Sequence, residues 1–231
     1  MNLLLIPGIN NTAQTFAPMI AAMPSHIDCF PVDCAALPNV DDIARAILAD
    51  APARFVVGGH SFGGYVALAI LALAPERVAG VILINTGTGS DTPTAAAARE
   101  ERALRAEAGE YAALADAASA RAYHPDNLGR EDLMAERAAA LLGYGAERYA
   151  AHSRASAIRP DRTELLKNSG VPVLVVSADK DVVIPTERQR DMAQNLGAEN
   201  VVIAQAGHML PAERPVLLAN AVSEWLDRVK P

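Results

Sequence analysis

A serine stands between two glycines in the segment Gly59-His60-Ser61-Phe62-Gly63. An extended apolar run, 54–58, precedes this segment, and a long apolar run of helical character, 65–74, follows it. At a strand-to-helix junction the glycines allow a tight turn that lifts the serine hydroxyl above the sheet. The unpaired N–H groups at the start of the helix then face the place where an oxyanion would form. The pattern predicts a nucleophilic serine that performs hydrolytic chemistry.

Such a serine needs partners, because its hydroxyl is a weak nucleophile until a base and a third, orienting group lie within hydrogen-bond reach. Downstream of Ser61 the chain has Asp179 and Asp181 after one apolar run and His208 after the next. The carboxyl ends of parallel strands meet at one edge of a sheet, where ligands bind, so these side chains can converge there. We therefore expect His208 to act as the base and one of the two aspartates to orient it.

The elements that must position these residues alternate along the chain. Short runs rich in Val, Ile and Leu alternate with longer helical patterns, which is typical of a parallel sheet covered by helices on both faces. The predicted strands are 2–6, 27–32, 54–58, 78–84, 171–177 and 199–204. The predicted helices are 12–22, 40–49, 61–73, 185–196 and 213–229.

The alternation stops between about residues 90 and 161, where alanine, glutamate and arginine dominate. Apolar residues at helical spacing predict one helix around 104–118 and a second around 133–141, ended by Gly143 and Gly145. Two interpretations stay open for this insertion. It is either a lid over the serine or a solvated helical hairpin with no role in binding.

The order of these motifs resembles that of the α/β-hydrolase superfamily, in its small branch that carries a cap. The resemblance covers nearly the whole chain and rests on four motifs: Pro7-Gly8-Ile9, the serine segment 59–63, Asp181 four residues before Pro185, and Gly207-His208 followed by Glu213-Arg214-Pro215. It implies an α/β fold with a mostly parallel sheet of about six strands, helices on both faces and an α-helical cap. It also implies a core of residues 1–89 and 162–231, with a cap of residues 90–161.

The resemblance assigns a role to each residue of a catalytic triad. Ser61 would attack an acyl carbonyl, His208 would take its proton, and Asp181 would orient the histidine, since Asp181 matches the family's Asp-x-x-x-Pro spacing. Asp179 is the alternative acid, although its place near the strand end also suits a turn-capping role. Asn85 stands where some relatives carry the acid, but an amide cannot stabilise an imidazolium as a carboxylate does.

The backbone N–H groups of Phe62 and Ile9 are the expected oxyanion-hole donors. Phe62 directly follows the nucleophile, and Ile9 lies in the loop after the first strand, where Pro7 replaces the histidine that is more common in relatives. Asn10 is a candidate substrate contact. Asn11 could serve in the same way, although loop amides also favour turns on their own.

The remaining histidines and the two cysteines are expected to have structural roles. His60 is expected to be packed or hydrogen-bonded rather than to act as a base. His124 and His152, in the insertion, are expected at the surface. Cys29 and Cys34 are expected to be reduced packing residues, because two cysteines are not the density of a disulfide scaffold.

The composition narrows the class of function. The chain has 231 residues, of which 51% are hydrophobic and 20% charged, with a net charge of −7 and an isoelectric point near 5.2. This acidic excess, with no basic block, argues against nucleic-acid and membrane partners. The chain shows no signal peptide and no apolar stretch of about 18 residues, so we expect a cytoplasmic protein. We expect it to be a monomer or a homodimer. It also lacks metal-ligand spacing and phosphate-binding glycine loops, so we expect no metal and no cofactor.

Three functions are open at this point. The first is a cofactor-independent serine hydrolase that acts on a small ester. The second uses the same triad for hydrolysis of a thioester, lactone or carbon–carbon bond, for elimination or for perhydrolysis; Arg154, Arg159 or Arg162 in the pocket would favour substrates that carry a carboxylate. The third is a receptor that keeps the hydrolase fold and binds a small molecule with little or no turnover.

Overall fold

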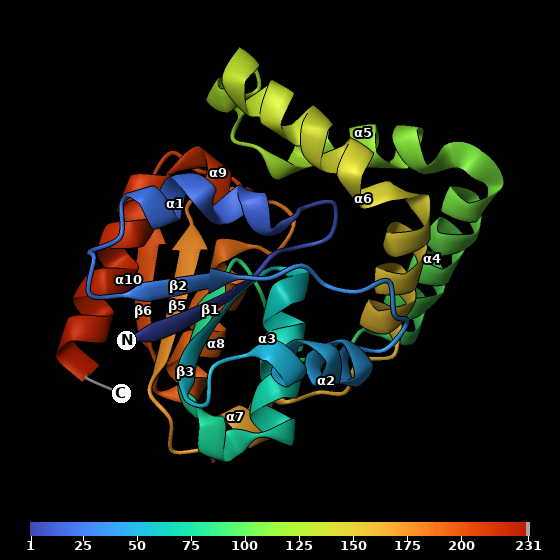
Figure 1. Cartoon of the computed structure of the whole chain (residues 1–231). Coiled ribbons are helices and arrows are strands. Elements are labelled where there is room, and N and C mark those ends of the chain that lie inside the picture. Colours follow the sequence, from blue (N-terminus) through green and yellow to red (C-terminus); the bar gives the residue numbers. More distant parts are fainter. Residues whose placement is uncertain (230–231) are drawn as a thin grey trace.

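The computed structural model describes residues 1–229. At its centre lies a six-stranded sheet in which every pair of neighbouring strands is parallel, in the order β2-β1-β3-β4-β5-β6 (Figure 1). The strands are β1 (Asn2–Ile6), β2 (Asp28–Pro31), β3 (Phe55–His60), β4 (Val78–Ile84), β5 (Val173–Ala178) and β6 (Glu199–Ile203). Each of them overlaps a strand predicted from the sequence, so the expected parallel sheet of about six strands is confirmed.

Helices cover both faces of the sheet, and the alternation of side chains along each strand supplies both contacts. In β1, Leu4 and Ile6 pack against one layer, whereas Leu3 and Leu5 pack against the other. The first layer contains α2 (Val40–Asp50), α3 (Phe62–Leu73), α7 (Thr163–Lys167) and α8 (Thr186–Leu196). The second layer contains η1 (Ala13–Phe16), α1 (Ala17–Ala21), α9 (Leu210–Glu213) and α10 (Pro215–Val229).

The centre of the molecule is the unit formed by β3, α3 and β4. Every residue of β3 and β4 is buried, and α3 is buried from Phe62 to Leu71. Burial of apolar surface contributes roughly 25 cal/mol per Å², so this unit is the best anchored part of the fold. The short helix η2 (Pro75–Arg77) connects α3 to β4. The turn between β3 and α3, which contains Ser61, is therefore held at both ends by the core.

Residues 90–161 are almost entirely helical, and we call them the helical segment. The segment contains α4 (Pro93–Arg105), a π-helical turn η3 (Ala106–Glu110), α5 (Tyr111–Ala122), η4 (Pro125–Asn127) and α6 (Glu131–Ala157). Figure 1 shows α4, α5 and α6 grouped together to one side of the sheet. The placement of the boundary between core and cap at residues 89/90 and 161/162 stays a prediction.

Two glycines interrupt the helices of the helical segment. Gly109, with φ 94°, interrupts the helix expected over 104–118, which the sequence analysis did not predict. Gly145, with φ 78° and ψ 166°, breaks α6 at the place where the sequence predicted a break. The helical stretch from there to Ala157 was not predicted. A glycine adopts positive φ at little cost, and the helix resumes beyond it where α6 packs against α4.

The two ends of the helical segment are joined to each other at its base. The N–H of Arg162 donates to the carbonyl oxygen of Thr88 at 3.0 Å. The hydroxyls of Thr88 and Thr163 also share a hydrogen bond of 2.7 Å. The segment thus leaves the core after β4 and returns before β5, and these two strands are direct neighbours in the sheet.

The cysteines are packing residues, as the sequence predicted. Both are free thiols, and Cys34 is 4% exposed within the core layer of α2 and α3. Burial, with a smaller contribution from Asp33, raises the pKa of the Cys34 thiol to about 12. None of the helices in residues 1–229 combines the length and the apolar character that a membrane span requires.

Candidate active site

Ser61 occupies a strained turn between β3 and α3. Its backbone has φ 52° and ψ −116°, in a region that non-glycine residues rarely occupy. Such a conformation costs on the order of 1–3 kcal/mol and persists only where the surroundings enforce it. Here the Ser61 N–H donates to the carbonyl oxygen of Ile84 at 2.9 Å, and the Ser61 carbonyl accepts from the Thr86 hydroxyl at 2.6 Å. The hydroxymethyl group is therefore held in one orientation at the carboxyl edge of the sheet.

The two glycines of the serine segment are required by close backbone contacts. A Cβ atom on Gly59 would lie 2.2 Å from the carbonyl oxygen of Gly63. A Cβ atom on Gly63 would lie 2.1 Å from the carbonyl oxygen of Ile6, at the end of β1. Both separations are far shorter than a non-bonded contact, so only glycine lets α3 approach β1 and β3 this closely.

The structure brings Ser61, His208 and Asp181 into one hydrogen-bonded chain. The Nε2 atom of His208 lies 2.9 Å from Ser61 Oγ, and the Nδ1 atom of His208 lies 2.9 Å from Asp181 Oδ2. The Asp181 carboxylate is fully shielded from solvent, and 8% of the His208 side chain is exposed. The imidazole thus spans the distance between a buried carboxylate and the serine hydroxyl.

Of the two candidate acids, only Asp181 contacts His208. Its Oδ1 accepts the N–H groups of Val183 and Ile184, both at 2.9 Å, and its Oδ2 also accepts from Gln189. Asp179 instead bonds the N–H of Ala206 at 3.2 Å, which joins the loop after β5 to the loop after β6. The carboxylate of Asp179 therefore joins two loops at this edge of the sheet and does not cap its own turn.

Two buried side chains form hydrogen bonds with the backbone of His208. Its carbonyl oxygen accepts from Asn85 Nδ2 at 2.9 Å and bonds His60 Nε2 at 2.7 Å. Asn85 also donates to the carbonyl oxygen of Gly207 and accepts from the N–H of Ala178. This role of Asn85 was missed in the sequence, although an amide at the end of a buried strand, with a donor and an acceptor to place, is a signal that could have found it.

His60 is packed and hydrogen-bonded, as expected, and it stays uncharged. Burial, with a smaller contribution from the neighbouring His208, lowers its pKa to about 3. Since the carbonyl oxygen of His208 can only accept, His60 carries its proton on Nε2. A neutral His60 places no second positive charge beside the imidazole of His208.

Ile9 and Phe62, the expected oxyanion donors, line the same cavity as Ser61. Among the backbone hydrogen bonds of loops, turns and helix caps in residues 1–229, none has the N–H of Ile9 or Phe62 as its donor. Asn11 Nδ2 donates to the carbonyl oxygen of Ile9 at 2.9 Å and so fixes this loop. Asn10 also lines the cavity, and its Oδ1 accepts from Tyr111.

His152 is deeply buried, so its expected surface position was wrong. It is 1% exposed, its Nε2 lies 2.7 Å from the carbonyl oxygen of Ala35, and its ring stacks on Phe62 with the centroids 4.5 Å apart. Burial lowers its pKa to about 4. His124 is also mostly shielded, with 12% of its side chain exposed. The alanine-rich sequence of α6 does not indicate which face of the helix is buried, because alanine is compatible with both buried and exposed positions.

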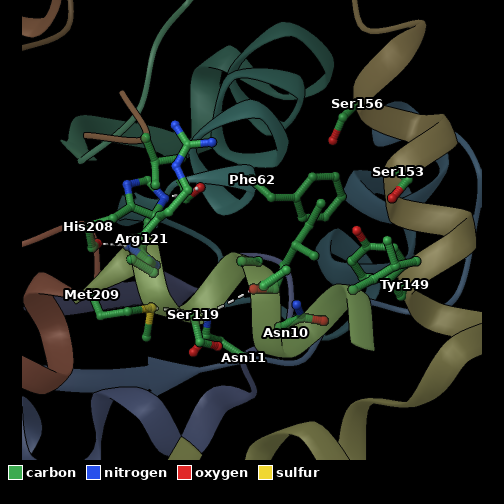
Figure 2. A pocket seen from close by; sticks show the side chains of 18 of the residues that line it. Asn10, Asn11, Phe62, Ser119, Arg121, Tyr149, Ser153, Ser156, His208 and Met209 are labelled. Atoms are coloured by element: carbon green, nitrogen blue, oxygen red, sulfur yellow. Dashed lines mark hydrogen bonds between the residues drawn. The ribbon is translucent and has the colours of Figure 1, made fainter. Parts of the chain in front are cut away.

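A cavity of about 580 Å³ contains Ser61 and His208. Its wall is formed jointly by the core and the helical segment, which contributes residues of α4, α5 and α6. Figure 2 shows Met209 and Arg121 on the same side of the cavity as His208, with Tyr149, Ser153 and Ser156 on the other side. The helical segment therefore contacts the space above the serine, which a solvated hairpin remote from the site would not do.

The arginines that line this cavity differ from those proposed from the sequence. Arg154 pairs with Glu100 and Glu107, Arg159 with Asp91, and Arg162 with Asp41, and none of the three arginines lines the cavity. That expectation was wrong, since all three are used to hold the helical segment together or to join it to the core. The arginines in the cavity wall are instead Arg99, Arg102, Arg121 and Arg137.

The arrangement has the parts that acyl transfer needs. A serine hydroxyl bonded to an imidazole, which is bonded in turn to a buried carboxylate, can lose its proton as it attacks a carbonyl carbon. The positive end of the α3 dipole lies beside this serine, where negative charge would develop. Within residues 1–229, no group of three or more His, Cys, Asp or Glu side chains is placed to hold a metal ion.

Known proteins with this architecture are numerous. The sequence profile described as "Alpha/beta hydrolase family" matches residues 3–221. A thermophilic esterase from Thermogutta terrifontis, solved with malate bound, is 25% identical, with a TM-score of 0.93 over 99% of this chain and 90% of that one. An enol-lactonase from Burkholderia xenovorans LB400 is also 25% identical, with a TM-score of 0.87 over 98% of this chain and 91% of that one. A hydrolase from Pseudomonas aeruginosa PA01, at 22% identity and a TM-score of 0.86 over 97% and 89% of the two chains, is similar in fold.

Proposed function

The chain belongs to the alpha/beta hydrolase family, and on this basis we propose that it is a cofactor-independent serine hydrolase that cleaves a small carboxylic ester. The observation that carries the proposal is the hydrogen-bonded chain from Ser61 Oγ through His208 to the buried Asp181, each link at 2.9 Å. The likeness to an esterase and an enol-lactonase at 25% identity supports ester chemistry.

In the first half of the reaction, His208 Nε2 takes the proton from Ser61 Oγ as this oxygen attacks the ester carbonyl carbon. The N–H groups of Ile9 and Phe62 donate hydrogen bonds that stabilise the negative charge developing on the carbonyl oxygen. Asp181 stabilises the imidazolium through its bond to Nδ1. The intermediate then collapses: the carbon–oxygen bond to the alcohol breaks, and the alcohol leaves with the proton from His208. An acyl group remains on Ser61.

In the second half, a water molecule takes the place of the alcohol. His208 removes a proton from this water, whose oxygen attacks the acyl carbon, and the same two N–H groups donate hydrogen bonds to the new oxyanion. The bond to Ser61 Oγ then breaks, and His208 returns the proton to the serine. The products are one carboxylic acid and one alcohol, and the enzyme is restored.

Lactone hydrolysis is the second candidate, because the same steps open a cyclic ester whose alcohol stays attached to the acyl group. The likeness to an enol-lactonase favours it over thioester or carbon–carbon cleavage, elimination and perhydrolysis. A receptor with this fold would bind its ligand with little or no turnover. A panel of short-chain and long-chain esters, thioesters and lactones separates these functions by the rate of product formation.

The test of the mechanism is Ser61→Ala, with Ser223→Ala on α10 as the matched control outside the cavity. We expect the wild type and Ser223→Ala to hydrolyse para-nitrophenyl acetate and to be labelled by a fluorophosphonate at Ser61, as read by peptide mass spectrometry. Ser61→Ala should lose both signals. Ester turnover that survives in Ser61→Ala would show that the mechanism is wrong, and tight ligand binding without turnover in the wild type would favour the receptor.

A further inference from the structure

The cavity above Ser61 has a charge opposite to that of the chain as a whole. The protein has a net charge of −7. Among the described residues that line the cavity, four are arginines, and none is an aspartate, glutamate or lysine. Cationic side chains that line a concave site raise the local concentration of anionic ligands. The negative net charge of the chain therefore does not account for the positive charge of this cavity.

Two of the four arginines form ion pairs with nearby aspartates. Arg99 on α4 pairs with Asp91, and Asp91 in turn pairs with Arg159. Arg137 on α6 pairs with Asp116 and also donates to the hydroxyl of Ser119. These contacts join α4, α5 and α6 to their surroundings, so both arginines have structural roles.

The guanidinium groups of the other two, Arg102 and Arg121, form no ion pair and no hydrogen bond with residues 1–229. Arg102 lies on α4, one turn after Arg99, and is half-buried. Arg121 lies in the last turn of α5 and is exposed. The next residue, Ala122, accepts the N–H of Met209 at 3.0 Å, which places this end of α5 directly beside the loop of His208. Figure 2 shows Arg121 on the His208 side of the cavity.

We propose that the substrate is an ester or lactone that carries a carboxylate, and that Arg102 and Arg121 are the residues that select it. This inference rests on the proposed hydrolase function and names the substrate class of the same site. A guanidinium presents a planar fork of N–H donors that matches the two oxygens of a carboxylate. The cavity of about 580 Å³ is large enough for a small acyl chain with one charged end.

The remaining wall explains why an anion is preferred and not merely tolerated. It contains apolar side chains such as Leu114, Leu141 and Met209. A neutral ligand that fills this space would leave the guanidinium of the half-buried Arg102 with less water and no partner, and an unpaired polar group makes a site reject such a ligand. The exposed Arg121 keeps its water and attracts the anion through its charge. A carboxylate supplies the missing partner.

The experiment compares two chromogenic esters that differ only in charge. The para-nitrophenyl monoester of glutaric acid has a free carboxylate, whereas para-nitrophenyl methyl glutarate has the same chain with the carboxylate masked. We expect the wild type to prefer the charged ester in kcat/KM by about 10- to 100-fold, as a charge-assisted hydrogen bond predicts. In Arg102→Gln combined with Arg121→Gln this preference should disappear, because kcat/KM for the charged ester falls to that of the masked ester. The single variants show which arginine contributes more.

Arg105→Gln is the matched control, because Arg105 lies on the same helix as Arg102 but pairs with Glu110 and is absent from the cavity wall. It should keep the preference. Equal rates for the two esters in the wild type would overturn the inference and leave the hydrolase function intact. Failure to hydrolyse either ester would contradict the proposed function instead.

A binding measurement tests the anion site without turnover. Calorimetry of Ser61→Ala with monomethyl glutarate should show binding that weakens at high salt and is lost when Arg102 and Arg121 are both replaced by glutamine. Equal binding of dimethyl glutarate would contradict the inference. Equal or tighter binding of methyl phosphate in place of monomethyl glutarate would assign the two arginines to phosphate rather than carboxylate.

Discussion

Asn85 Nδ2 donates to the carbonyl oxygen of His208 at 2.9 Å. Asn85 directly follows β4 and His208 follows β6, so this bond passes over the carboxyl end of β5, the strand that lies between them. The imidazole of His208 is held by Asp181 on one side, and its backbone is held by Asn85 on the other. The position of His208 is thus set by two buried side chains, Asp181 and Asn85.

Asn85→Asp tests this support. The substitution keeps the size of the side chain and its acceptor for the Ala178 N–H, but it replaces an amide donor by an oxygen that faces the carbonyls of Gly207 and His208. We expect the free energy of unfolding to fall by about 1–3 kcal/mol and kcat to fall by at least tenfold. Chemical denaturation and ester turnover measure these changes. Asn168→Asp, on the protein surface, is the control, and equal kcat values for the two variants would contradict the role of Asn85.

Asp181→Asn should lower kcat/KM by about 10⁴-fold with the fold intact, because an amide cannot stabilise the imidazolium that forms on His208. Asp179→Asn should stay close to wild type, since an amide oxygen still accepts the N–H of Ala206. Steady-state kinetics with a chromogenic ester compare the two. A larger loss in Asp179→Asn would reverse the assignment of the acid.

Acid should destabilise the protein through its buried histidines. The pKa of His152 is lowered from 6.5 to about 4 in the folded state, so between these values the unfolded chain binds a proton that the folded chain does not. The free energy of unfolding should therefore fall as the pH decreases from 6.5 towards 4. His60, with a pKa of about 3, adds to the same trend. Thermal unfolding of His152→Gln should depend less steeply on pH, whereas His26→Gln, at the surface, should keep the wild-type slope.

Glu213→Gln should loosen the contact between the helical segment and the loop of His208. The buried Glu213 carboxylate accepts the Gly207 N–H through Oε1, at 2.8 Å, and the His124 N–H and the Asn127 amide through Oε2. A glutamine turns an N–H₂ group towards one of these donors. We expect a loss of about 1–3 kcal/mol in stability and faster hydrogen exchange over residues 123–128. Glu224→Gln, exposed on α10, should change neither.

The core could be predicted from the sequence because its strands are buried on both faces. Runs such as Val78–Ile84 are apolar at every position, which is typical of a strand buried on both faces. The glycines around Ser61 are visible in the sequence as a spaced pair, and the tight turn needs both of them. The predicted membership in the α/β-hydrolase superfamily is confirmed by the match over residues 3–221. Ser61, His208 and Asp181 could be selected because they follow strands of a sheet whose order the family already implies.

The cavity wall could not be predicted in the same way. Alanine-rich helices carry little periodicity, so nothing in the sequence of α6 shows that His152 faces the core while Leu142 is 87% exposed. The arginines proposed from the sequence to lie in the pocket were wrong for the same reason. Whether Arg102 or Arg154 reaches the cavity depends on how α4 and α6 lie against each other, and only the folded chain contains that information.

The Arg162 N–H donates to the Thr88 carbonyl oxygen, and the hydroxyls of Thr88 and Thr163 share a hydrogen bond, so the two ends of the helical segment are joined to each other. Its two stems meet above neighbouring strands, and the free energy of closing a loop grows only slowly with the number of residues inside it. A change in the length of the segment should therefore cost the sheet little. Its sequence is constrained where it contacts the site, because His152 stacks on Phe62 and Ala122 accepts the N–H of Met209.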